Sequence, residues 1–542
     1  MKVITSVLFI LSLTIIPLIA GTSSNTIIPK PQMFKALQGQ FQLTDQTDLS
    51  SDTPLSINAQ EYLQTQLSLQ AGFTLKKRER ALTSINYRHE TGLEDEAYKL
   101  KITTTKIVIQ ANSTSGFFYA TVSLMQLMDA RIWAEETSQD YQTKWTVPAS
   151  VIEDYPRFKW RGMMLDSSRN FFSKAYVKKF IDRMAQHKLN VFHWHLTDDE
   201  GWRIEIKKYP LLTQVGAKRG PGTELPFSLY PAMRGPKEKM QEGYYTQDDI
   251  REIVAYATKR SVNILPEIDM PAHAKAAVTA YHDLLQDPND KSQYISVQKV
   301  SNNTMDAGLD STYLFLENVI KEVTTLFPFE YIHLGGDEIP KGAWKKSPAV
   351  MKLMQKEKLQ STQEVQAYFF TKMDKVLAKH NRKMIAWQEV RKHNDVLRDD
   401  TIIMAWRGNG VGIKAAKKGQ KVIMSPAEYL YFDQQYFKGK NEFGHTWAGP
   451  TDTKEAYSYN PTAKLSTVKE IHAIQGVHGC LWSETALNES IADYLAWPRM
   501  FALAEIGWSS QKQRNWKEFR GRAFGKGLER LTIQQVSYRD PQ

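Results

Sequence analysis

The feature that most constrains the fold is a regular alternation, from about Arg157 onward, of short apolar runs with amphipathic helical runs. The apolar runs end in glycine or polar residues, which is typical of strands buried on both faces. One helical run, Gln247–Arg260, opens with acidic residues behind Thr246, a predicted N-cap. Eight parallel strands with helical crossovers predict a TIM (β/α)8 barrel. The predicted strands are Gly162–Asp166, Asn190–Asp198, Val262–Met270, Glu330–Asp337, Met384–Glu389, Thr401–Trp406, Lys421–Ser425 and Gln475–Trp482.

The helical runs between the strands differ in length. Several are long and amphipathic, whereas those after the fifth and sixth strands look short or irregular, so we expect a distorted barrel there. Besides Gln247–Arg260, the predicted helices are Ala175–Gln186, Leu314–Leu326, Thr362–His380 and Ala492–Glu505.

The sequence before the barrel has a different pattern of predicted elements. Two strand-like runs, Ala97–Ile102 and Lys106–Gln110, are joined by a threonine-rich turn and followed by a predicted helix from Ser115 to about Arg131. These elements predict a small α+β domain that ends near a proline-marked loop at Asp154-Tyr-Pro156. The predicted organisation is a signal peptide at 1–20, an N-terminal α+β domain at 21–155, the barrel at 156–510 and a C-terminal helical tail at 511–542.

Charge and composition exclude some classes of function. The 542 residues are 42% hydrophobic and 24% charged, which is typical of a globular protein with a sizeable core. Lys and Arg total 70 against 59 for Asp and Glu, and the basic residues are scattered in short clusters such as Lys345-Lys346. Because no basic arm or basic-aromatic stripe is present, we expect a solvated basic surface and no nucleic-acid partner. No cofactor is expected, and the oligomeric state is not predicted.

The first twenty residues have the layout of a secretory signal peptide. Lys2 supplies a positive start, Val3–Ile19 is mostly apolar, and Ala20-Gly21 ends the run with small residues. An uncleaved anchor is the alternative, but the run is short for a membrane span. Cys480 is the only cysteine, and export without disulfides fits a bacterial periplasm or the cell exterior. We therefore expect an exported, periplasmic or secreted protein with no stable membrane span after cleavage.

Two adjacent carboxylates, Asp337 and Glu338, follow the fourth predicted strand and its glycine pair. The carboxyl ends of barrel strands build the active site in this fold, so the pair is well placed for acid chemistry on a sugar or an ester. The alternative is that both acids only cap the next helix. Catalysis is favoured because the other strands also end in polar or aromatic residues.

The residues at the strand ends together predict a sugar-binding pocket. Tryptophans offer flat apolar faces on which a sugar ring stacks, while carboxylates and an arginine hydrogen-bond its hydroxyls. Singly, each residue has an ordinary explanation in a core or an ion pair. Together they do not, because unrelated core residues would not collect at one end of eight strands. Besides the acid pair, these residues include Asp166, Arg169, His193, His195, Asp198, Asp199, Glu267, Asp269, His273, Trp387, Trp406, Tyr429, Tyr431, Asp433, Trp482 and Glu484.

Five motifs resemble the signature segments of the family 20 glycoside hydrolases, the β-N-acetylhexosaminidases. They occur in that family's order within about residues 27–509, a span that includes its non-catalytic N-terminal domain. Two positions depart from the family pattern, Ala272 where glycine is common and Glu200 where glutamine is common, and neither is expected to touch the chemistry. The motifs are Asp166-Ser-Ser-Arg-Asn-Phe171, His193-Trp-His-Leu-Thr-Asp-Asp-Glu-Gly-Trp-Arg203, Pro266-Glu-Ile-Asp-Met-Pro-Ala-His273, His333-Leu-Gly-Gly-Asp-Glu338 and Leu481-Trp-Ser-Glu484.

The resemblance implies exo-acting, retaining hydrolysis that removes terminal N-acetylglucosamine from a glycan, with acceptance of N-acetylgalactosamine left open. In this family the 2-acetamido oxygen of the substrate attacks its own anomeric carbon and forms an oxazolinium intermediate. The resemblance assigns Glu338 as the acid that protonates the leaving oxygen and Asp337 as the residue that orients the acetamido N–H. It assigns Tyr431 as the hydrogen-bond donor to the acetamido carbonyl.

Further roles follow from the same resemblance. A supporting relay of Asp198, His273 and Asp269 is implied behind the acid, and the alignment of the motif favours Asp198 over Asp199. No metal ligand is assigned. The implied substrate-binding residues are Arg169, Trp387, Trp406, Asp433, Trp447, Trp482 and Glu484.

Two rival functions from other classes remain open. The pair His193 and His195 on one strand is typical of metal-dependent amidohydrolases, although that family carries the pair on the first strand and ends later strands in further histidines. The second rival is a carbohydrate-binding protein without activity, against which the intact Asp337-Glu338 pair argues.

Overall fold

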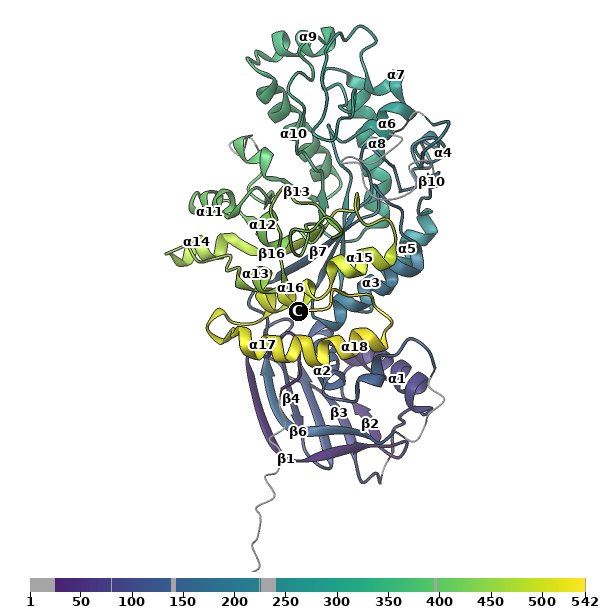
Figure 1. The fold of residues 1–542 in the computed structure, drawn as a ribbon, viewed down its shortest axis with the longest axis vertical. Helices are drawn as coiled ribbons and strands as arrows, with labels where there is room; N and C mark the ends of the chain where they lie inside the picture. The colour runs from purple at the N-terminus through teal and green to yellow at the C-terminus, as the bar shows by residue number, and fades with distance from the viewer. Residues whose placement is uncertain are drawn as a thin grey trace, which may run out of the picture.

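The computed structural model of the protein describes residues 25–78, 80–137, 143–223, 225, 240–393 and 397–541, the side chains of 391–393 excepted. They form two bodies stacked along the long axis of the molecule, a six-stranded sheet with its helices and a closed barrel surrounded by helices (Figure 1). The predicted signal peptide lies outside the described residues. Among the helices that are described, none combines the length and the apolarity needed to cross a membrane.

The N-terminal sheet is mixed and runs in the order β1-β6-β4-β5-β3-β2. Buried and less buried side chains alternate along its strands, so that one face packs against α2. The predicted continuation of this helix to Arg131 is wrong. Helix α2 ends at Gln126, because Asp129 caps a separate 3-10 turn by accepting from the backbone N–H of Arg131. The elements are β1 (Met33–Leu43), β2 (Asp48–Ser51), η1 (Pro54–Ser56), α1 (Ile57–Ala71), β3 (Ser84–His89), β4 (Tyr98–Ile102), β5 (Lys106–Ala111), α2 (Thr114–Gln126), η2 (Ala130–Trp133) and β6 (Trp145–Asp154).

The eight predicted strands of the second body form a closed parallel barrel. This confirms the predicted fold class, a (β/α)8 barrel preceded by a small α+β domain. Apart from one residue at or next to the amino end of four strands, the strand residues are buried, because helices cover the outside and side chains fill the inside. The strands are β7 (Trp160–Asp166), β8 (Val191–His195), β11 (Asn263–Glu267), β12 (Tyr331–His333), β13 (Lys383–Trp387), β14 (Ile402–Ala405), β15 (Val422–Met424) and β16 (Ile474–Leu481).

Several predicted strands run past the observed carboxyl ends, and the surplus residues include polar ones such as Asp198, Asp269 and Asp337. Strand β12 stops at His333, whereas the prediction extended it to Asp337. The cause is a turn at Gly335 and Gly336, whose φ angles of 65° and 96° leave the extended region. A Cβ on Gly335 would lie 1.7 Å from the Asp269 carboxylate, so the turn requires glycine there.

The long predicted helices are present with small shifts of their ends, with one exception. Thr246 caps α5 in a capping box, as predicted. The helix predicted over Ala492–Glu505 is wrong as a single element, because Pro498 lacks the N–H that would continue the α-helical bonding, and α15 and α16 meet there. As expected, the element after β13 is only a 3-10 helix, η3, and α11 after β14 is short.

The elements that surround the barrel strands are α3 (Lys174–Gln186), α4 (Leu211–Gln214), β9 (Lys218–Arg219), β10 (Gln241–Glu242), α5 (Gln247–Thr258), α6 (Lys275–Ala280), α7 (His282–Leu285), α8 (Asp310–Leu326), α9 (Pro348–Glu357), α10 (Thr362–Lys379), η3 (Gln388–His393), α11 (Asn409–Lys417), α12 (Ala427–Leu430), α13 (Thr453–Ser458), α14 (Val468–Ala473), α15 (Glu489–Ala496) and α16 (Arg499–Trp508). Strands β9 and β10 pair with each other and lie outside the barrel sheet.

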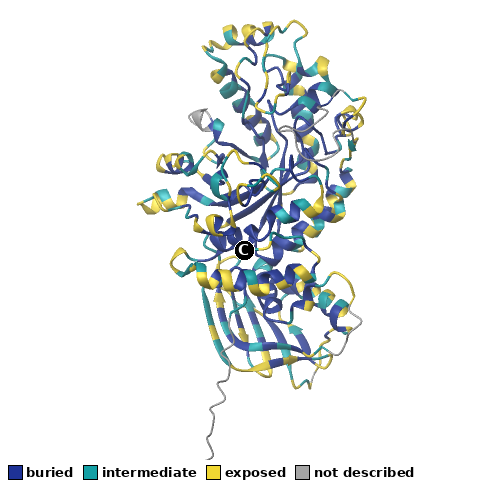
Figure 2. Ribbon diagram, viewed as in Figure 1, coloured by how far each residue is buried: buried dark blue, intermediate teal, exposed yellow. Residues whose placement is uncertain are grey.

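The C-terminal segment lies between the two bodies (Figure 1). It consists of η4 (Gln511–Gln513), α17 (Trp516–Arg522), the π-helix η5 (Ala523–Gly527) and α18 (Leu528–Ile533). Arg530 donates to the side chain of Gln126 in the N-terminal domain at 3.0 Å, and Arg522 pairs with Glu505 of α16 at 2.6 Å. The segment therefore ties the bodies together, and Figure 2 shows buried residues running through the barrel strands and across this junction.

Candidate active site

A cavity of about 720 Å³ opens at the carboxyl ends of the barrel strands, where this fold builds its active sites. Its wall comes from segments that follow six of the strands. Of the thirteen residues predicted for the site, Asp198, Asp269 and Trp387 lie behind the wall. The ten that line the cavity are Arg169, His273, Asp337, Glu338, Trp406, Tyr431, Asp433, Trp447, Trp482 and Glu484.

The backbone around the acid pair is held in unusual conformations. Glu338 and His273 both have φ 49°, in the left-handed region that residues with a Cβ rarely adopt. Gly336 passes so close to Phe370 that an added Cβ would lie 2.6 Å from its ring. Such conformations persist only where the surrounding structure imposes them, and they cluster at functional sites.

Asp337 and Glu338 share one neighbour and then diverge. His273 Nε2 lies 3.7 Å from Asp337 Oδ2 and 3.7 Å from Glu338 Oε2. Burial raises the pKa of Asp337 to about 6, although the positive ring of His273 opposes this rise. Asp337 Oδ1 has no hydrogen-bond partner among the described residues, whereas Glu338 Oε1 accepts from Arg407 Nη2 at 3.0 Å. An unpaired buried oxygen beside a cavity is a ready acceptor for a ligand N–H.

A chain of acids and histidines leads from the cavity into the barrel. His273 Nδ1 lies 3.0 Å from Asp198 Oδ1, and Asp198 Oδ2 lies 2.8 Å from His195 Nε2. Burial alone would raise the pKa of Asp198, but the charges of Arg169 and His273 hold it well below its usual value. Burial alone would lower the pKa of His273, but the charges of Asp198 and Asp337 raise it well above its usual value. The chain therefore alternates negative and positive groups.

The neighbouring acids Asp199 and Asp269 have other partners. Asp199 accepts from Asn303 Nδ2 at 2.9 Å and lies 3.8 Å from His273 Nδ1, so Asp198 is the one of the pair that bonds to His273. Asp269 Oδ1 accepts from the backbone N–H of Gly336 at 3.2 Å, which supports the turn that carries the acid pair. Burial raises the pKa of Asp269 well above its usual value.

Arg169 is a buried cation among three carboxylates. Its guanidinium nitrogens lie 2.8 Å from Asp198 Oδ2, 3.0 Å from Glu200 Oε2 and 3.3 Å from Asp166 Oδ2. Its carbon Cζ lies 5.0 Å from the ring centroid of Trp482. Glu200 does not line the cavity, but it bonds directly to this predicted substrate-binding residue, a contact that the sequence did not indicate. Burial raises the pKa of Glu200 to about 7, although Arg169 opposes the rise.

Aromatic rings form the walls of the cavity. The rings of Trp406 and Tyr431 are within 12° of parallel with centroids 6.2 Å apart, and Trp447 stands edge-on to both. Trp482 lies 6.3 Å from Tyr431. Trp387, predicted to contact the substrate, lies behind Trp482 at 5.8 Å and supports the wall. Apolar ring faces in this arrangement suit a sugar ring or an acetamido methyl group.

Two further carboxylates in the cavity differ in charge. Burial would raise the pKa of Glu484, but Arg169 and His445 hold it at about 2, and His445 Nε2 lies 3.6 Å from Glu484 Oε2. Burial raises the pKa of Asp433 to about 7. Asp433 Oδ2 accepts from Gln434 Nε2 at 2.9 Å, and Oδ1 has no partner among the described residues. Near neutral pH, Glu484 is therefore ionised and Asp433 is partly protonated.

Arg407, Glu389 and His445 were not among the predicted site residues. Arg407 pairs with Glu338, lies 3.4 Å from Glu389 Oε1 and covers the ring of Trp406 at 4.4 Å. Burial raises the pKa of Glu389 to about 7. The strand-end rule that selected Trp406 also reaches Arg407, which follows it directly. No pattern pointed to His445, because it reaches the cavity from a loop.

Among the described residues, four groups of acids and histidines lie close enough to hold a metal ion, and all share one network. In the rival metal-dependent hypothesis, His193 and His195 would be ligands. Both rings are fully buried, and the two nitrogens of His195 contact Glu267 Oε2 at 2.5 Å and Asp198 Oδ2 at 2.8 Å. The pair therefore fits an ion network better than a catalytic metal site with a position open to water. The groups are His193–Glu267–His333, His195–Asp198–Asp269, Asp198–Asp199–His273 and His273–Asp337–Glu338.

An acid pair between tryptophan walls at the open end of a barrel is suited to breaking a glycosidic bond, and the fold and cavity define the class as a glycoside hydrolase. The sequence matches the family model of the glycosyl hydrolase family 20 catalytic domain over residues 158–511. It matches the model of domain 2 of the same family over residues 24–155. The chain belongs to glycosyl hydrolase family 20.

Individual relatives are similar over most of the chain. A beta-hexosaminidase of Vibrio furnissii is 36% identical over 485 residues, which are 89% of this chain and 76% of the relative. A beta-hexosaminidase of Porphyromonas gingivalis is 34% identical over 520 residues, which are 95% of this chain and 64% of the relative. The crystal structure of the GH20 exo beta-N-acetylglucosaminidase from Vibrio harveyi in complex with N-acetylglucosamine has a TM-score of 0.88 at 35% identity. The match covers 96% of this chain and 79% of the chain in that crystal structure.

Proposed function

We propose that the protein is an exo-acting β-N-acetylhexosaminidase that removes terminal N-acetylglucosamine from glycans with retention of configuration. The observation that carries the proposal is the adjacent pair Asp337 and Glu338, one with an unpaired buried oxygen, beside the aromatic walls of the cavity. The names of the similar proteins from Vibrio furnissii and Vibrio harveyi support the same activity.

The two carboxylates divide the chemistry between them. Asp337 accepts from the acetamido N–H through its unpaired Oδ1 and orients the acetamido oxygen toward the anomeric carbon. Tyr431 donates its O–H to that oxygen from the wall. Glu338 gives its proton to the leaving oxygen and later takes one from the water that opens the oxazolinium ring. Asp337, with its pKa of about 6, is mostly ionised above that pH and then offsets the positive charge of the ring.

The substrate's own amide provides the first test. We expect an aryl N-acetyl-β-glucosaminide to be cleaved at least about 1000-fold faster than the matching β-glucoside, because only the former carries the internal nucleophile. A thiazoline mimic of the cyclic intermediate is expected to bind far more tightly than N-acetylglucosamine. Equal rates on both glycosides, or equal affinity for both ligands, contradicts the proposal.

Glu338→Gln tests the proton donor. The variant is expected to lose more activity on a disaccharide, whose leaving oxygen needs a proton, than on an activated aryl glycoside, whose leaving group departs without one. Leaving groups of graded acidity, measured as kcat/KM, provide the scale. Equal losses across that scale would remove Glu338 from the acid role.

The rival functions have separate tests. Turnover of a chromogenic N-acetylglucosaminide excludes a protein that only binds sugars. Loss of that turnover on incubation with a chelator, with recovery on adding a divalent metal, would revive the metal-dependent alternative. A panel of N-acetylglucosaminides and N-acetylgalactosaminides of different linkage and length defines the natural glycan.

Export is part of the proposal and rests on residues 1–20 alone. If the segment is a signal peptide, the mature protein starts near Gly21 and is found in the periplasm or the medium. Sequencing the N-terminus of the expressed protein and fractionating the cells decides this, and a full-length protein in the cytoplasm contradicts it.

A further inference from the structure

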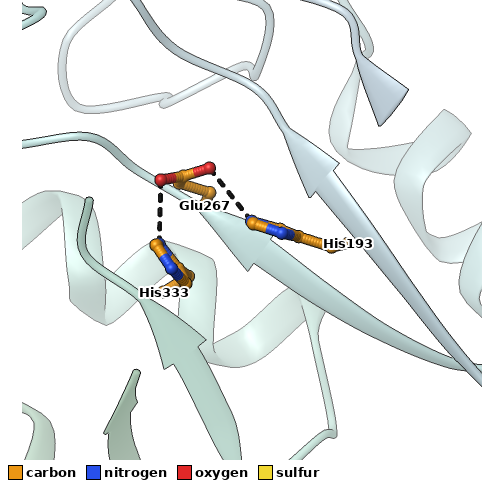
Figure 3. A group of neighbouring side chains, drawn as sticks. All are labelled: His193, Glu267 and His333. Atoms are coloured by element: carbon orange, nitrogen blue, oxygen red, sulfur yellow. Dashed lines mark ion pairs between the residues drawn. The ribbon is translucent and has the colours of Figure 1, made fainter. Parts of the chain in front are cut away.

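Glu267, the last residue of β11, is fully buried and does not line the cavity. Its Oε1 accepts from Trp387 Nε1 at 2.9 Å and lies 2.8 Å from His333 Nδ1. Its Oε2 lies 2.5 Å from His195 Nδ1 and 3.0 Å from His193 Nε2. Figure 3 shows His193 and His333 converging on this carboxylate from the neighbouring strands. One buried acid therefore contacts four side chains beneath the site.

The first branch of these contacts leads to the wall of the cavity. Trp387 is almost fully buried behind Trp482, with ring centroids 5.8 Å apart. The bond from its indole N–H to Glu267 fixes the rotation of the ring. Because Trp482 lines the cavity, a change in the Trp387 ring alters the depth of the apolar wall.

The second branch leads to the relay. Burial would raise the pKa of Glu267, but His333, His195 and His193 hold it well below its usual value, so the carboxylate is charged. His195 contacts Glu267 through Nδ1 and Asp198 through Nε2, so it donates from both nitrogens. Asp198, fixed in this way, contacts Arg169 at 2.8 Å as well as His273.

We propose that Glu267 is a positioning residue for the hydrolysis, in which one buried carboxylate fixes Trp387 behind the apolar wall and fixes Asp198 through His195. This inference rests on the proposed function. A carboxylate suits the position because it accepts on both oxygens and donates from neither, whereas an amide would direct an N–H at one of its donors. A methionine of similar length would leave the Trp387 indole N–H and His195 Nδ1 without this partner.

The test compares Glu267→Gln and Glu267→Met with a matched pair of controls at Asp154. Asp154 is also a buried carboxylate that accepts from an indole, Trp508 Nε1 at 2.8 Å, and from a cation, Lys188 Nζ at 2.8 Å. It lies at the junction with the N-terminal domain and does not line the cavity. Asp154→Asn and Asp154→Leu therefore reproduce the loss of a buried carboxylate without touching the proposed network.

We expect Glu267→Met to lose about 100-fold in kcat/KM on the N-acetylglucosaminide per folded molecule, and Glu267→Gln to lose less. The ratio of kcat/KM for the N-acetyl substrate to that for the N-propanoyl substrate depends on how much space the apolar wall leaves for the acyl group. This selectivity is expected to fall in both variants. Both Asp154 variants are expected to keep the wild-type rate and selectivity per folded molecule. Circular dichroism and thermal unfolding give the folded fraction.

Double-mutant cycles separate the two branches. Glu267→Gln is combined with Trp387→Phe in one cycle and with Asp198→Asn in another. In each double variant, the fold-loss of kcat/KM is expected to be at least about threefold smaller than the product of the two single fold-losses, because each pair acts as one unit. The combination of Asp154→Asn with Trp387→Phe is expected to be additive. These cycles also decide the question if Glu267→Met does not fold.

Three results would overturn the inference. They are unchanged N-acyl selectivity in Glu267→Gln, additive cycles, or activity losses that only follow the folded fraction as in the Asp154 variants. The failure of the proposed function looks different, because it appears in the wild type as equal cleavage of glycosides with and without the acetamido group.

Discussion

The two ends of the barrel bury the same kinds of groups but differ in how completely they are paired. At the amino ends, Arg161 forms a bidentate pair with Glu96 at 2.7 and 2.9 Å, and Lys188 Nζ lies 2.8 Å from Asp154 Oδ2. The other oxygen of Asp154 accepts from Trp508 Nε1. None of these five side chains has a buried polar atom without a partner in the described structure. The N-terminal domain, which supplies Glu96 and Asp154, therefore completes this end of the barrel.

At the carboxyl ends, several buried carboxylates lack a full set of hydrogen-bond partners. Asp337, Asp433 and Asp269 each keep one buried oxygen without a partner among the described residues. Burial raises the pKa of each of them, because it removes the water that would solvate the charged carboxylate. Such groups reduce stability unless something pairs with them. In the proposed function, the cavity acids Asp337 and Asp433 keep these oxygens for the substrate at a cost in stability, whereas the acids at the amino ends are paired within the protein.

Asp337→Asn has the largest expected effect and sharpens this comparison. We expect kcat/KM on an N-acetylglucosaminide to fall about 1000-fold, because the amide no longer offsets the charge of the intermediate. At pH 8 the variant is expected to be more stable than the wild type by up to about 3 kcal/mol, since an acid with a pKa of about 6 no longer has to ionise in the folded state. Chemical unfolding measures the stability. A variant less stable than the wild type at pH 8 would contradict the proposed difference between the two ends of the barrel.

Asp154→Asn is expected to have the opposite profile. It leaves Lys188 buried without its counter-charge, which we expect to reduce the free energy of unfolding by about 3 kcal/mol at pH 7. The rate per folded molecule is expected to equal that of the wild type, because the residue lies at the far end of the barrel. A loss of rate without a loss of stability would show that the two ends are coupled.

Asp433→Asn tests the comparison through pH. The folded-state pKa of Asp433 is about 7 against an ordinary value of 3.8, so the folded protein holds this proton more tightly and the wild type loses stability as pH rises from about 4 to 7. The asparagine variant lacks this loss. Its unfolding free energy relative to the wild type is therefore expected to rise by about 2 kcal/mol between pH 4 and pH 8, part of the full effect being screened by solvent in the cavity. A difference that does not vary with pH contradicts the raised pKa.

Trp447→Ala is expected to have the smallest effect. The ring is 57% exposed at the rim of the cavity, so its removal costs little packing, and stability is expected to stay within about 0.5 kcal/mol. The loss of one stacking face for the substrate is expected to raise KM about fivefold with little change in kcat. Trp482→Ala, a change in the wall beneath, serves as the comparison and is expected to lower kcat as well.

Much of the fold could be predicted because buried strands are short apolar runs with marked ends. All eight barrel strands and the Thr246 cap were predicted in this way. The errors lie where a single local group overrides the pattern. Pro498 divides a continuous helical pattern, and Gly335 ends a strand before its polar residues.

Less of the site could be predicted. The sequence placed ten of the thirteen predicted residues at the cavity, because side chains that follow parallel barrel strands meet at one end. It did not separate wall from support, so Trp387 was expected in contact with the substrate. It also missed the bond between Glu200 and Arg169, which forms only when two loops pack together.

By itself, the sequence determined the class of fold, the family and the kinds of groups that collect at one end of the barrel, because the periodicity of local segments and the order of motifs carry that information. Only the tertiary structure decided which acid keeps an unpaired oxygen, which ring stands behind another, and which buried carboxylate contacts both the supporting ring and the relay. The reason is that the partner of a buried side chain comes from elsewhere in the chain: Glu267 and Trp387, which share a hydrogen bond, are 120 residues apart.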